Sequence, residues 1–170
     1  MEDLSHADSK GRALMVGVAH KDESVREAIA SSSLKMKTDT LNSIINMNVP
    51  KGDVLGSARI ASILAAKKCS SLIPMCHPLR ITSAEVLFRS DILEEEFSHL
   101  RILCRVQAFD RTGVEMEALT GVSVAGLTVY DMCKSLDREM ILGEICLIKK
   151  TGGKSGDYVR SIEDISSYDL

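Results

Sequence analysis

The chain has 170 residues, of which 45% are hydrophobic and 26% are charged, and its formal net charge is -3. This length suits one domain with a buried core, and the composition is typical of a globular protein. The mild negative charge disfavours nucleic-acid binding, which relies on a basic surface. Lysines nevertheless gather at 67–68 and 149–154, which suits a small anionic ligand.

The sequence shows no targeting or membrane segment. Its first 15 residues contain no basic start followed by an apolar run, and no uncharged apolar stretch reaches the roughly 18 residues of a membrane span. The cysteines form neither a C-x-x-C pair nor a zinc-site spacing (Cys69, Cys76, Cys104, Cys133 and Cys146). We therefore expect a cytoplasmic protein in a reducing compartment, with no membrane partner and no metal site.

The first part of the chain predicts a strand followed by two helices. Residues 23–37 are compatible with either a strand or a helix, but they nearly alternate in hydrophobicity and contain a run of serines, which favours a strand. A short helix is predicted over 38–47, with its first threonine or aspartate as the N-cap. A clearer helix follows at 54–68, because Asp53 is a good N-cap residue and the closing lysines suit the helix dipole.

A loop and three strands are predicted in the remainder. Pro74 and Pro78 bracket part of SSLIPMCHPL, a segment that can be neither helix nor interior strand, so we expect a rigid loop. Residues 81–88 and 99–109 alternate in hydrophobicity around an acidic polar stretch, which predicts an antiparallel pair of strands. The segment MILGEICLIKK, residues 140–150, predicts the last strand.

Between these strands the pattern predicts a helix of about 24 residues. Thr112 can be its N-cap, and Glu115, three positions on, completes a capping box. Gly121 and Gly126 each cost about 1 kcal/mol inside a helix. Because the helix keeps both glycines, we expect it to lie tightly against another backbone, and a contact between subunits would explain them.

The order strand, helix, strand, strand, helix, strand is the ferredoxin-like arrangement. It is an α+β fold, with one antiparallel βαββαβ sheet and helices on one face. We expect a single domain over 1–156, followed by a mobile acidic tail at 157–170. This fold hosts enzymes, metal carriers and ligand sensors, so it does not decide the function.

The glycine-rich stretch TGGKSG, residues 151–156, is not a nucleotide-binding P-loop. That motif needs a glycine at the position of Ile148. The chain after it has little helical periodicity, so we expect no helix N-terminus to face an anion. The stretch is as compatible with an exit from the last strand as with a ligand loop.

His77 lies between Cys76 and Pro78 in the predicted rigid loop. A hydrogen bond to a backbone carbonyl explains such a histidine most simply, and a ligand contact is the best functional interpretation. Zinc bound by Cys76 and His77 is disfavoured, because no further cysteine or histidine lies at ligand spacing.

Three acidic residues of the long predicted helix are candidates for chemistry. Asp131 and Lys134 lie three positions apart, so their side chains can touch; most such pairs are surface ion pairs, and proton transfer by the lysine requires partial desolvation. Glu115 is explained by the capping box, but Glu117 is not. Glu117 and Asp131 share nearly the same helical face about 21 Å apart, so a substrate that touches both requires a site between two subunits.

Four motifs in the same order resemble those of the MoaC family, the cyclic pyranopterin monophosphate synthases of molybdenum cofactor biosynthesis: KGDVLGSARIASILAAKK, LIPMCHPL, TGVEMEALTGVSVAGLTVYDMCK and KTGGKSGD. The resemblance covers approximately residues 4–158. It implies a lyase that converts 3',8-cyclo-7,8-dihydroguanosine 5'-triphosphate into cyclic pyranopterin monophosphate and pyrophosphate, without a metal or redox cofactor. It also implies a homo-oligomer, a hexamer made of three dimers.

The resemblance further implies roles for individual residues. The active-site aspartate of the family falls on Asp131, its partner lysine on Lys134 and a further catalytic lysine on Lys51. TGGKSG is then expected to lie at the edge of a triphosphate site. The residues that the resemblance assigns to substrate binding are Met75, Cys76, His77, Glu115, Met116, Glu117, Lys21, Arg26, Lys67, Lys150 and Lys154.

Two stretches depart from the family pattern. The usual MVDVS is here MVGVA, with Gly17 and Ala19, and the usual ARIAG ends here in Ser62. The catalytic set is intact, but the first departure leaves a catalytically weakened relative as one alternative. The other alternative is a non-catalytic sensor that binds a nucleotide, which needs the basic loops but has no use for the pair of Asp131 and Lys134.

Overall fold

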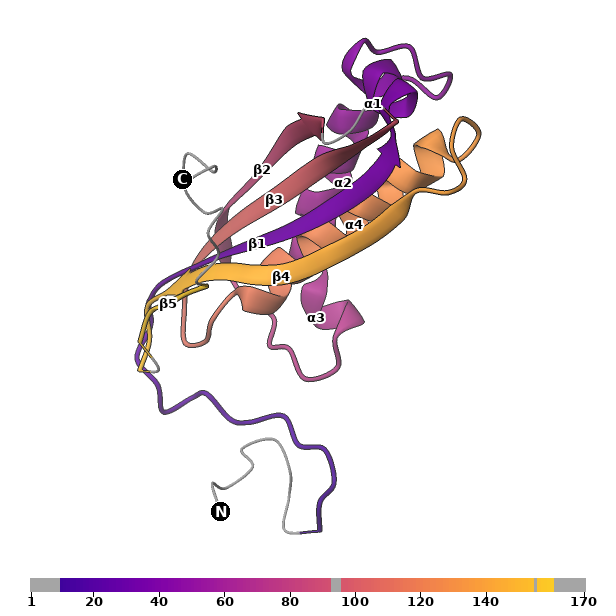
Figure 1. The fold of residues 1–170 in the computed structure, drawn as a ribbon. Coiled ribbons are helices and arrows are strands. Elements are labelled where there is room, and N and C mark those ends of the chain that lie inside the picture. Colours follow the sequence, from indigo (N-terminus) through magenta and orange to yellow (C-terminus); the bar gives the residue numbers. More distant parts are fainter. Residues whose placement is uncertain (1–9, 93–95, 155, 161–170) are drawn as a thin grey trace.

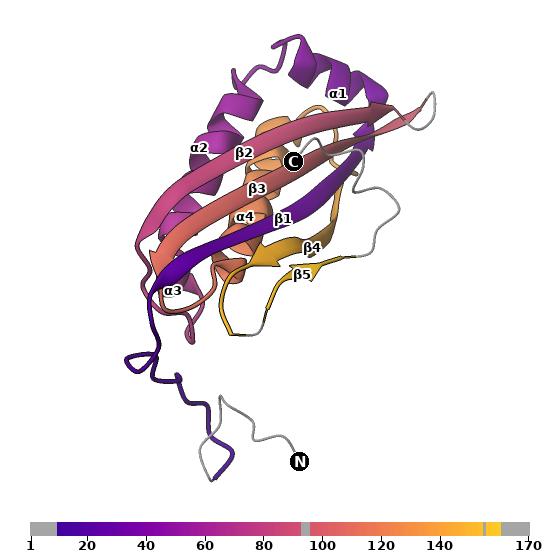
Figure 2. The same ribbon diagram turned by 90° about the vertical axis from the view of Figure 1, so that its left-hand side faces the viewer.

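The structure, a computed structural model, describes residues 10–92, 96–154 and 156–160. In this part of the chain one antiparallel sheet has the strand order β2-β3-β1-β4-β5 (Figure 1). The helices lie on one face of the sheet, as Figure 2 shows. The strands are β1 Ser24–Lys37, β2 Ile81–Ile92, β3 Phe97–Asp110, β4 Ile141–Thr151 and β5 Tyr158–Val159, and the helices are α1 Thr38–Ile45, α2 Val54–Lys67, α3 Cys69–Leu72 and α4 Glu115–Cys133. The predicted α+β, ferredoxin-like fold is confirmed.

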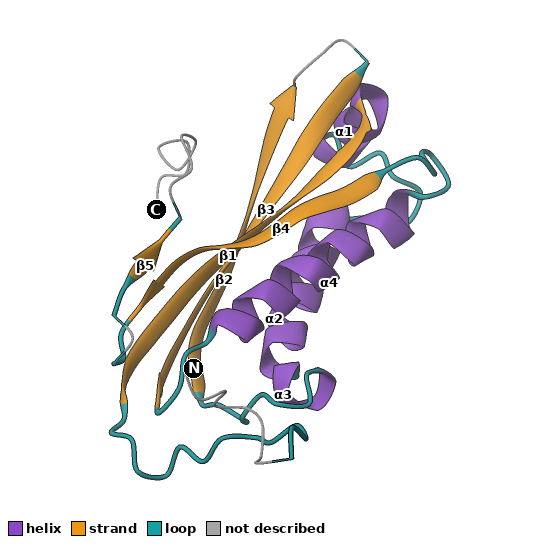
Figure 3. Ribbon diagram, turned by 60° about the horizontal axis from the view of Figure 1, so that its bottom comes forward, coloured by secondary structure: helices purple, strands orange, loops and turns teal. Residues whose placement is uncertain are grey.

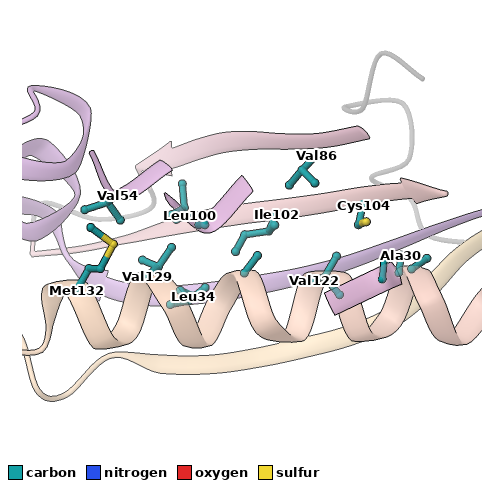
Figure 4. Close-up of a cluster of buried hydrophobic side chains, with 14 of the residues drawn as sticks. Ala30, Leu34, Val54, Val86, Leu100, Ile102, Cys104, Val122, Val129 and Met132 are labelled. Atoms are coloured by element: carbon teal, nitrogen blue, oxygen red, sulfur yellow. The ribbon is translucent and has the colours of Figure 1, made fainter. Parts of the chain in front are cut away.

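The main core fills the space between the sheet and the two long helices, α2 and α4 (Figure 4). Val122 and Val129 of α4 are fully buried there and meet strand residues such as Leu34 and Ile102. Strand β1 is central and pairs with β3 along its whole length, from Ser24 opposite Asp110 to Lys37 opposite Phe97. Packing of this face against α2 and α4 fixes the direction of the long helix along the sheet.

Strands β2 and β3 extend further than predicted. The polar stretch that was expected to be a turn continues the ladder, with Arg89 opposite Arg101 and Asp91 opposite His99. Asp91 explains why polar residues remain in the strands, because its carboxylate lies 2.6 Å from Arg101 Nε and 3.3 Å from Arg89 Nε. The first residues of the predicted rigid loop are helical, because α3 extends to Leu72. The segment between Pro74 and Pro78 is a loop, as predicted.

One predicted helix cap is confirmed and two are wrong. Asp53 Oδ1 accepts a hydrogen bond of 2.8 Å from the backbone N–H of Gly56 at the start of α2. Helix α1 begins after Lys37 without a side-chain cap. The predicted capping box is absent, because α4 begins at Glu115 and its carboxylate instead lies 3.1 Å from Lys150 Nζ.

The glycines of α4 face side chains of the same chain and not another backbone. A Cβ at Gly121 would lie 2.8 Å from Cys104 Sγ and 3.0 Å from Ser62 Oγ. A Cβ at Gly126 would lie 2.5 Å from Leu142 Cδ1. The close approach predicted for the helix is therefore present, but it is made to β3, β4 and α2, so the glycines give no support to a contact between subunits.

The stretch TGGKSG turns the chain from β4 back into β5. Lys149 and Lys150 of β4 pair with Val159 and Tyr158, so β5 lies in the segment that the sequence assigned to an acidic tail. The backbone N–H of Gly152 donates to Asp157 Oδ1 at 3.1 Å. Residues 161–170 lie outside the described part of the chain, and the domain boundary at 156 stays a prediction.

Candidate active site

The first turn of α4, the loop after α3 and the chain that precedes β1 meet at the α3 end of the domain (Figure 3). A cleft of about 360 Å³ is lined by residues of these three segments. Its volume is in the range of small-molecule sites. Seven predicted substrate-binding residues line it, which come from three separate parts of the sequence: Lys21, Met75, Cys76, His77, Glu115, Met116 and Glu117. The remaining lining residues are Val16, Val18, Leu79, Thr112 and Gly113.

A second cleft, of about 500 Å³, adjoins the first and shares Lys21, Thr112, Gly113 and Glu115 with it. Cationic side chains outnumber carboxylates in its wall. They are Lys21, Arg26, Arg111 and Lys154, whereas the acids are Asp22 and Glu115. Such a surface suits a polyanion such as a chain of phosphates.

Gly153 explains how TGGKSG contributes to the second cleft. Its φ is +93°, a conformation that other residues rarely adopt, and an added Cβ would overlap the guanidinium of Arg26. The glycine therefore lets the loop lie against Arg26, and this contact brings Lys154 to the same cleft. The loop acts as an edge of the cationic surface and not as a P-loop.

Glu117 is an acid held in an apolar setting. Its side chain is only 4% exposed, and burial raises the pKa of its carboxyl above the ordinary value. Cys69 lies beside it, with Sγ 3.5 Å from Thr120 Oγ1, and burial raises the pKa of this thiol to about 12. Burial thus shifts both groups towards their neutral forms, and of the two Glu117 lines the first cleft.

His77 makes the hydrogen bond that the simplest sequence interpretation predicted. Its Nε2 lies 2.9 Å from the carbonyl oxygen of Val16, so it donates to the chain that precedes β1. The ring also lines the first cleft. His77 can therefore support the chain before β1 and contact a ligand in the first cleft at the same time.

The predicted catalytic residues gather at the other end of α4, near α1. Lys134 Nζ lies 2.7 Å from Asp131 Oδ1, and Lys51 Nζ lies 2.9 Å from Asp131 Oδ2. Lys51 Nζ also donates to the Asp131 carbonyl at 2.8 Å. The hydrogen bond from Lys134 is the largest of the interactions that lower the pKa of the Asp131 carboxyl to about 2.

This group is exposed in the single chain. The side chains of Lys51, Lys134 and Asp131 are 45%, 52% and 59% exposed, so the partial desolvation that the sequence argument required is not present here. The two lysines line a shallow depression of about 410 Å³ together with Tyr130, Ser135 and Arg138. Two ammonium groups on one carboxylate can donate protons to a substrate and recover them, once water is excluded.

The predicted site residues therefore form two groups at opposite ends of α4. Lys150 belongs with the first group, through its ion pair with Glu115. Lys67 is the exposed last residue of α2 and lines neither cleft. The first two clefts share no lining residue with the depression beside Asp131.

Sequence reasoning missed several lining residues, of which Arg111 is the most polar. It directly precedes the TGVEMEAL motif, but nothing in the local pattern separates it from other loop arginines. Of the departures from the family pattern, Gly17 is exposed, and a Cβ there would meet nothing within 4 Å. An acid at this position would thus point to open space in the single chain.

Among the described residues, histidine, cysteine and carboxylate side chains do not form a group of three that could hold a metal ion. Within the same residues, the helices are too short or too polar to cross a membrane.

The fold and the two groups define an α+β protein with a cationic cleft at one end of α4 and a carboxylate bound by two lysines at the other. Comparison with known proteins identifies the family, because the model of the MoaC family matches residues 15–153. The chain belongs to the MoaC family.

Relatives from several bacteria match nearly the whole chain, and each is named cyclic pyranopterin monophosphate synthase. The protein of Desulfatibacillum aliphaticivorans is 55% identical over 159 residues, which is 94% of this chain and 98% of the relative. The protein of Roseiflexus sp. (strain RS-1) is 52% identical over 159 residues, 94% of this chain and 99% of the relative. The protein of Thermoanaerobacter sp. (strain X514) is 51% identical over 160 residues, 94% of this chain and 99% of the relative.

Proposed function

We propose that this chain converts 3',8-cyclo-7,8-dihydroguanosine 5'-triphosphate into cyclic pyranopterin monophosphate with release of pyrophosphate, a step of molybdenum cofactor biosynthesis. The name shared by its relatives supports this reaction. The observation that carries the proposal is the Asp131 carboxylate, which is bound by both Lys51 and Lys134. A sensor that only binds a nucleotide has no need of this group.

The proposed chemistry divides between the two groups of residues. Lys51 and Lys134, oriented by Asp131, deliver and remove protons as one ring opens and another closes. The cationic cleft with Arg26 and Lys154 holds the triphosphate and stabilises the pyrophosphate as it leaves, while the remaining phosphate closes into the cyclic monophosphate.

One substrate can contact both groups only if a second copy of the chain completes the site. The groups lie at the two ends of α4, about 21 Å apart as estimated from the helix rise. The exposure of Asp131 supports the same arrangement, because a partner subunit would cover it and supply the missing desolvation. We propose a hexamer built from three dimers, acting in the cytoplasm, with each site shared between two subunits.

The test is turnover by the purified protein. The cyclised dihydro-GTP is incubated with the wild type, with Lys134→Ala and with Lys37→Ala, and pyrophosphate and pterin product are quantified. Lys37 is a matched control, because it forms an exposed ion pair of 3.7 Å with Glu139 and lines none of the three depressions. We expect product from the wild type and Lys37→Ala and very little from Lys134→Ala; binding without turnover in the wild type would favour the sensor.

A further inference from the structure

The chain that precedes β1 forms one wall of the first cleft, and we call residues 16–21 the strap. Val16, Val18 and Lys21 are half-buried and line the cleft, whereas Gly17 and Ala19 are exposed. Figure 3 shows this segment crossing the end of the domain at which α3 lies. The strap thus presents one face to the cleft and the other to solvent.

Two side chains from elsewhere in the sequence bond to the strap's backbone. His77 Nε2 donates to the Val16 carbonyl at 2.9 Å, and Arg111 Nη1 donates to the Ala19 carbonyl at 2.9 Å. Arg111 also approaches the chain just after the strap, since its Nε lies 3.8 Å from Glu23 Oε1. The tethers stand at two points three residues apart, so they fix both the position and the direction of the strap.

Arg111 connects the strap to the cationic cleft. Its side chain lines the second cleft with Arg26 and Lys154, and Lys21, a strap residue, lines both clefts. A guanidinium has five N–H donors, and the bond to Ala19 uses one of them. The same residue can therefore hold the strap and face a bound anion.

We propose that Arg111 is a positioning residue that holds the strap against the two clefts, so that Val16, Val18 and Lys21 form a fixed wall around the substrate. This inference rests on the proposed function, because it takes the clefts to be the triphosphate site. Without Arg111 the tether at Ala19 is lost while that of His77 remains, and Lys21 loses its fixed place beside the phosphates. The residue acts through the strap and not on the reacting atoms.

Hydrogen exchange of the strap amides tests the tether without using activity. In Arg111→Ala we expect the Lys21 amide, which donates to the Val18 carbonyl at 3.0 Å within the strap, to exchange about tenfold faster, because loss of the Ala19 tether lets this turn open more often. Arg80→Ala is the matched control. Arg80 Nη2 lies 2.7 Å from Oε1 of the same Glu23 carboxylate, but the hydrogen bonds of Arg80 go to Asp110 and Phe109 and the residue lines neither cleft. Its loss should therefore leave the amide exchange of the strap unchanged. Equal exchange in wild type and Arg111→Ala would overturn the proposal.

Steady-state kinetics with the cyclised dihydro-GTP test the consequence for binding. For Arg111→Ala we expect KM to rise about tenfold with kcat changed by less than about twofold, because a positioning contact acts on binding. Lys154→Ala, which removes a cleft charge away from the strap, should raise KM without changing strap exchange. One outcome overturns this inference and leaves the proposed function standing. In it, Arg111→Ala speeds amide exchange in the strap without changing KM, whereas Lys154→Ala raises KM. Unchanged KM in both variants overturns the inference and the proposed site together.

Discussion

Lys134, which directly follows α4, binds the carboxylate of Asp131 in the last turn of that helix, with 2.7 Å between Nζ and Oδ1. This contact contributes most to the low pKa of Asp131, about 2, and it raises the pKa of Lys134 in return. A carboxyl whose pKa is lower in the folded than in the unfolded state stabilises the fold above its unfolded pKa, near 3.8. That contribution is lost as the pH falls through the folded value, so the ion pair persists at neutral pH.

The first prediction concerns this titration. Lys134→Ala should raise the pKa of Asp131 from about 2 towards 3.8, because it removes the strongest hydrogen bond to the carboxylate. Lys51→Ala should raise it less, and Lys37→Ala should leave it unchanged. The pKa can be followed by carbon NMR of the Asp131 carboxyl in acid. A larger effect of Lys51→Ala would mean that Lys51, and not Lys134, contributes most to the low pKa of Asp131.

The second prediction concerns Ser62, where the family pattern has glycine. Its hydroxyl is fully buried on the face of α2 that meets α4, beside the weakly polar thiol of Cys104, and among the described residues it makes no well-formed hydrogen bond. A buried unsatisfied hydroxyl costs about 1–3 kcal/mol, so Ser62→Ala should raise the free energy of unfolding by roughly 1 kcal/mol or more. Ser123→Ala is the control, because Ser123 Oγ donates to the Leu119 carbonyl at 2.8 Å. Denaturant unfolding should show a clear gain for Ser62→Ala only.

The third prediction follows from the neighbours of Gly121. An alanine Cβ there would lie 2.8 Å from Cys104 Sγ and 3.0 Å from Ser62 Oγ, both in fully buried side chains. Overpacking costs about 1–3 kcal/mol and exceeds the helix-propensity gain of about 1 kcal/mol, so Gly121→Ala should lower the free energy of unfolding.

Gly126→Ala provides the comparison for this substitution. The nearest atoms to its new Cβ are the ends of the leucine side chains at 142 and 34, which can rotate away. It should therefore cost less than Gly121→Ala in the same unfolding experiment. A larger loss for Gly126→Ala would mean that the leucines are more rigid than their position suggests.

The sequence predicted the order of the main elements, because the helices around α2 and α4 and the alternating strands β2 and β3 have recognisable hydrophobic periods, whereas β1 was assigned from a weaker alternation. It failed where tertiary contacts outweigh local preference. Thr112 and Glu115 match a capping box, but Lys150, distant in the sequence, takes the Glu115 carboxylate. Strand β2 likewise continues through Asp91, because Arg101 on the neighbouring strand forms an ion pair with its carboxylate, a contact that the local sequence does not indicate.

The candidate site was predictable only in part for a related reason. Asp131 and Lys134 are neighbours on one helix, so spacing alone indicated their contact. Lys51 is 80 positions from Asp131, and only the resemblance to a family assigned it to this group. Arg111 carried no local signal, because its role depends on the carbonyl of Ala19, which the fold brings to it from 92 positions away.

The last prediction concerns the shared site. Glu117 lines the first cleft, whereas Asp131 lies with its two lysines at the far end of the same helix. If one substrate touches both, each site takes Glu117 from one subunit and Asp131 from another. Glu117→Ala and Asp131→Ala should each be inactive, and exchange of their subunits into one oligomer should partly restore activity, because some sites then receive both intact residues.

Subunit exchange is started from a mildly dissociated mixture and followed by pyrophosphate release. The double variant Glu117→Ala, Asp131→Ala, mixed with either single variant, is the control, since no site in such an oligomer can hold both intact residues. Restoration in the first mixture and not in the control supports a site between subunits. A monomeric mass with full activity, or a liganded structure in which Glu117 and Asp131 of one chain reach the same substrate, would exclude it.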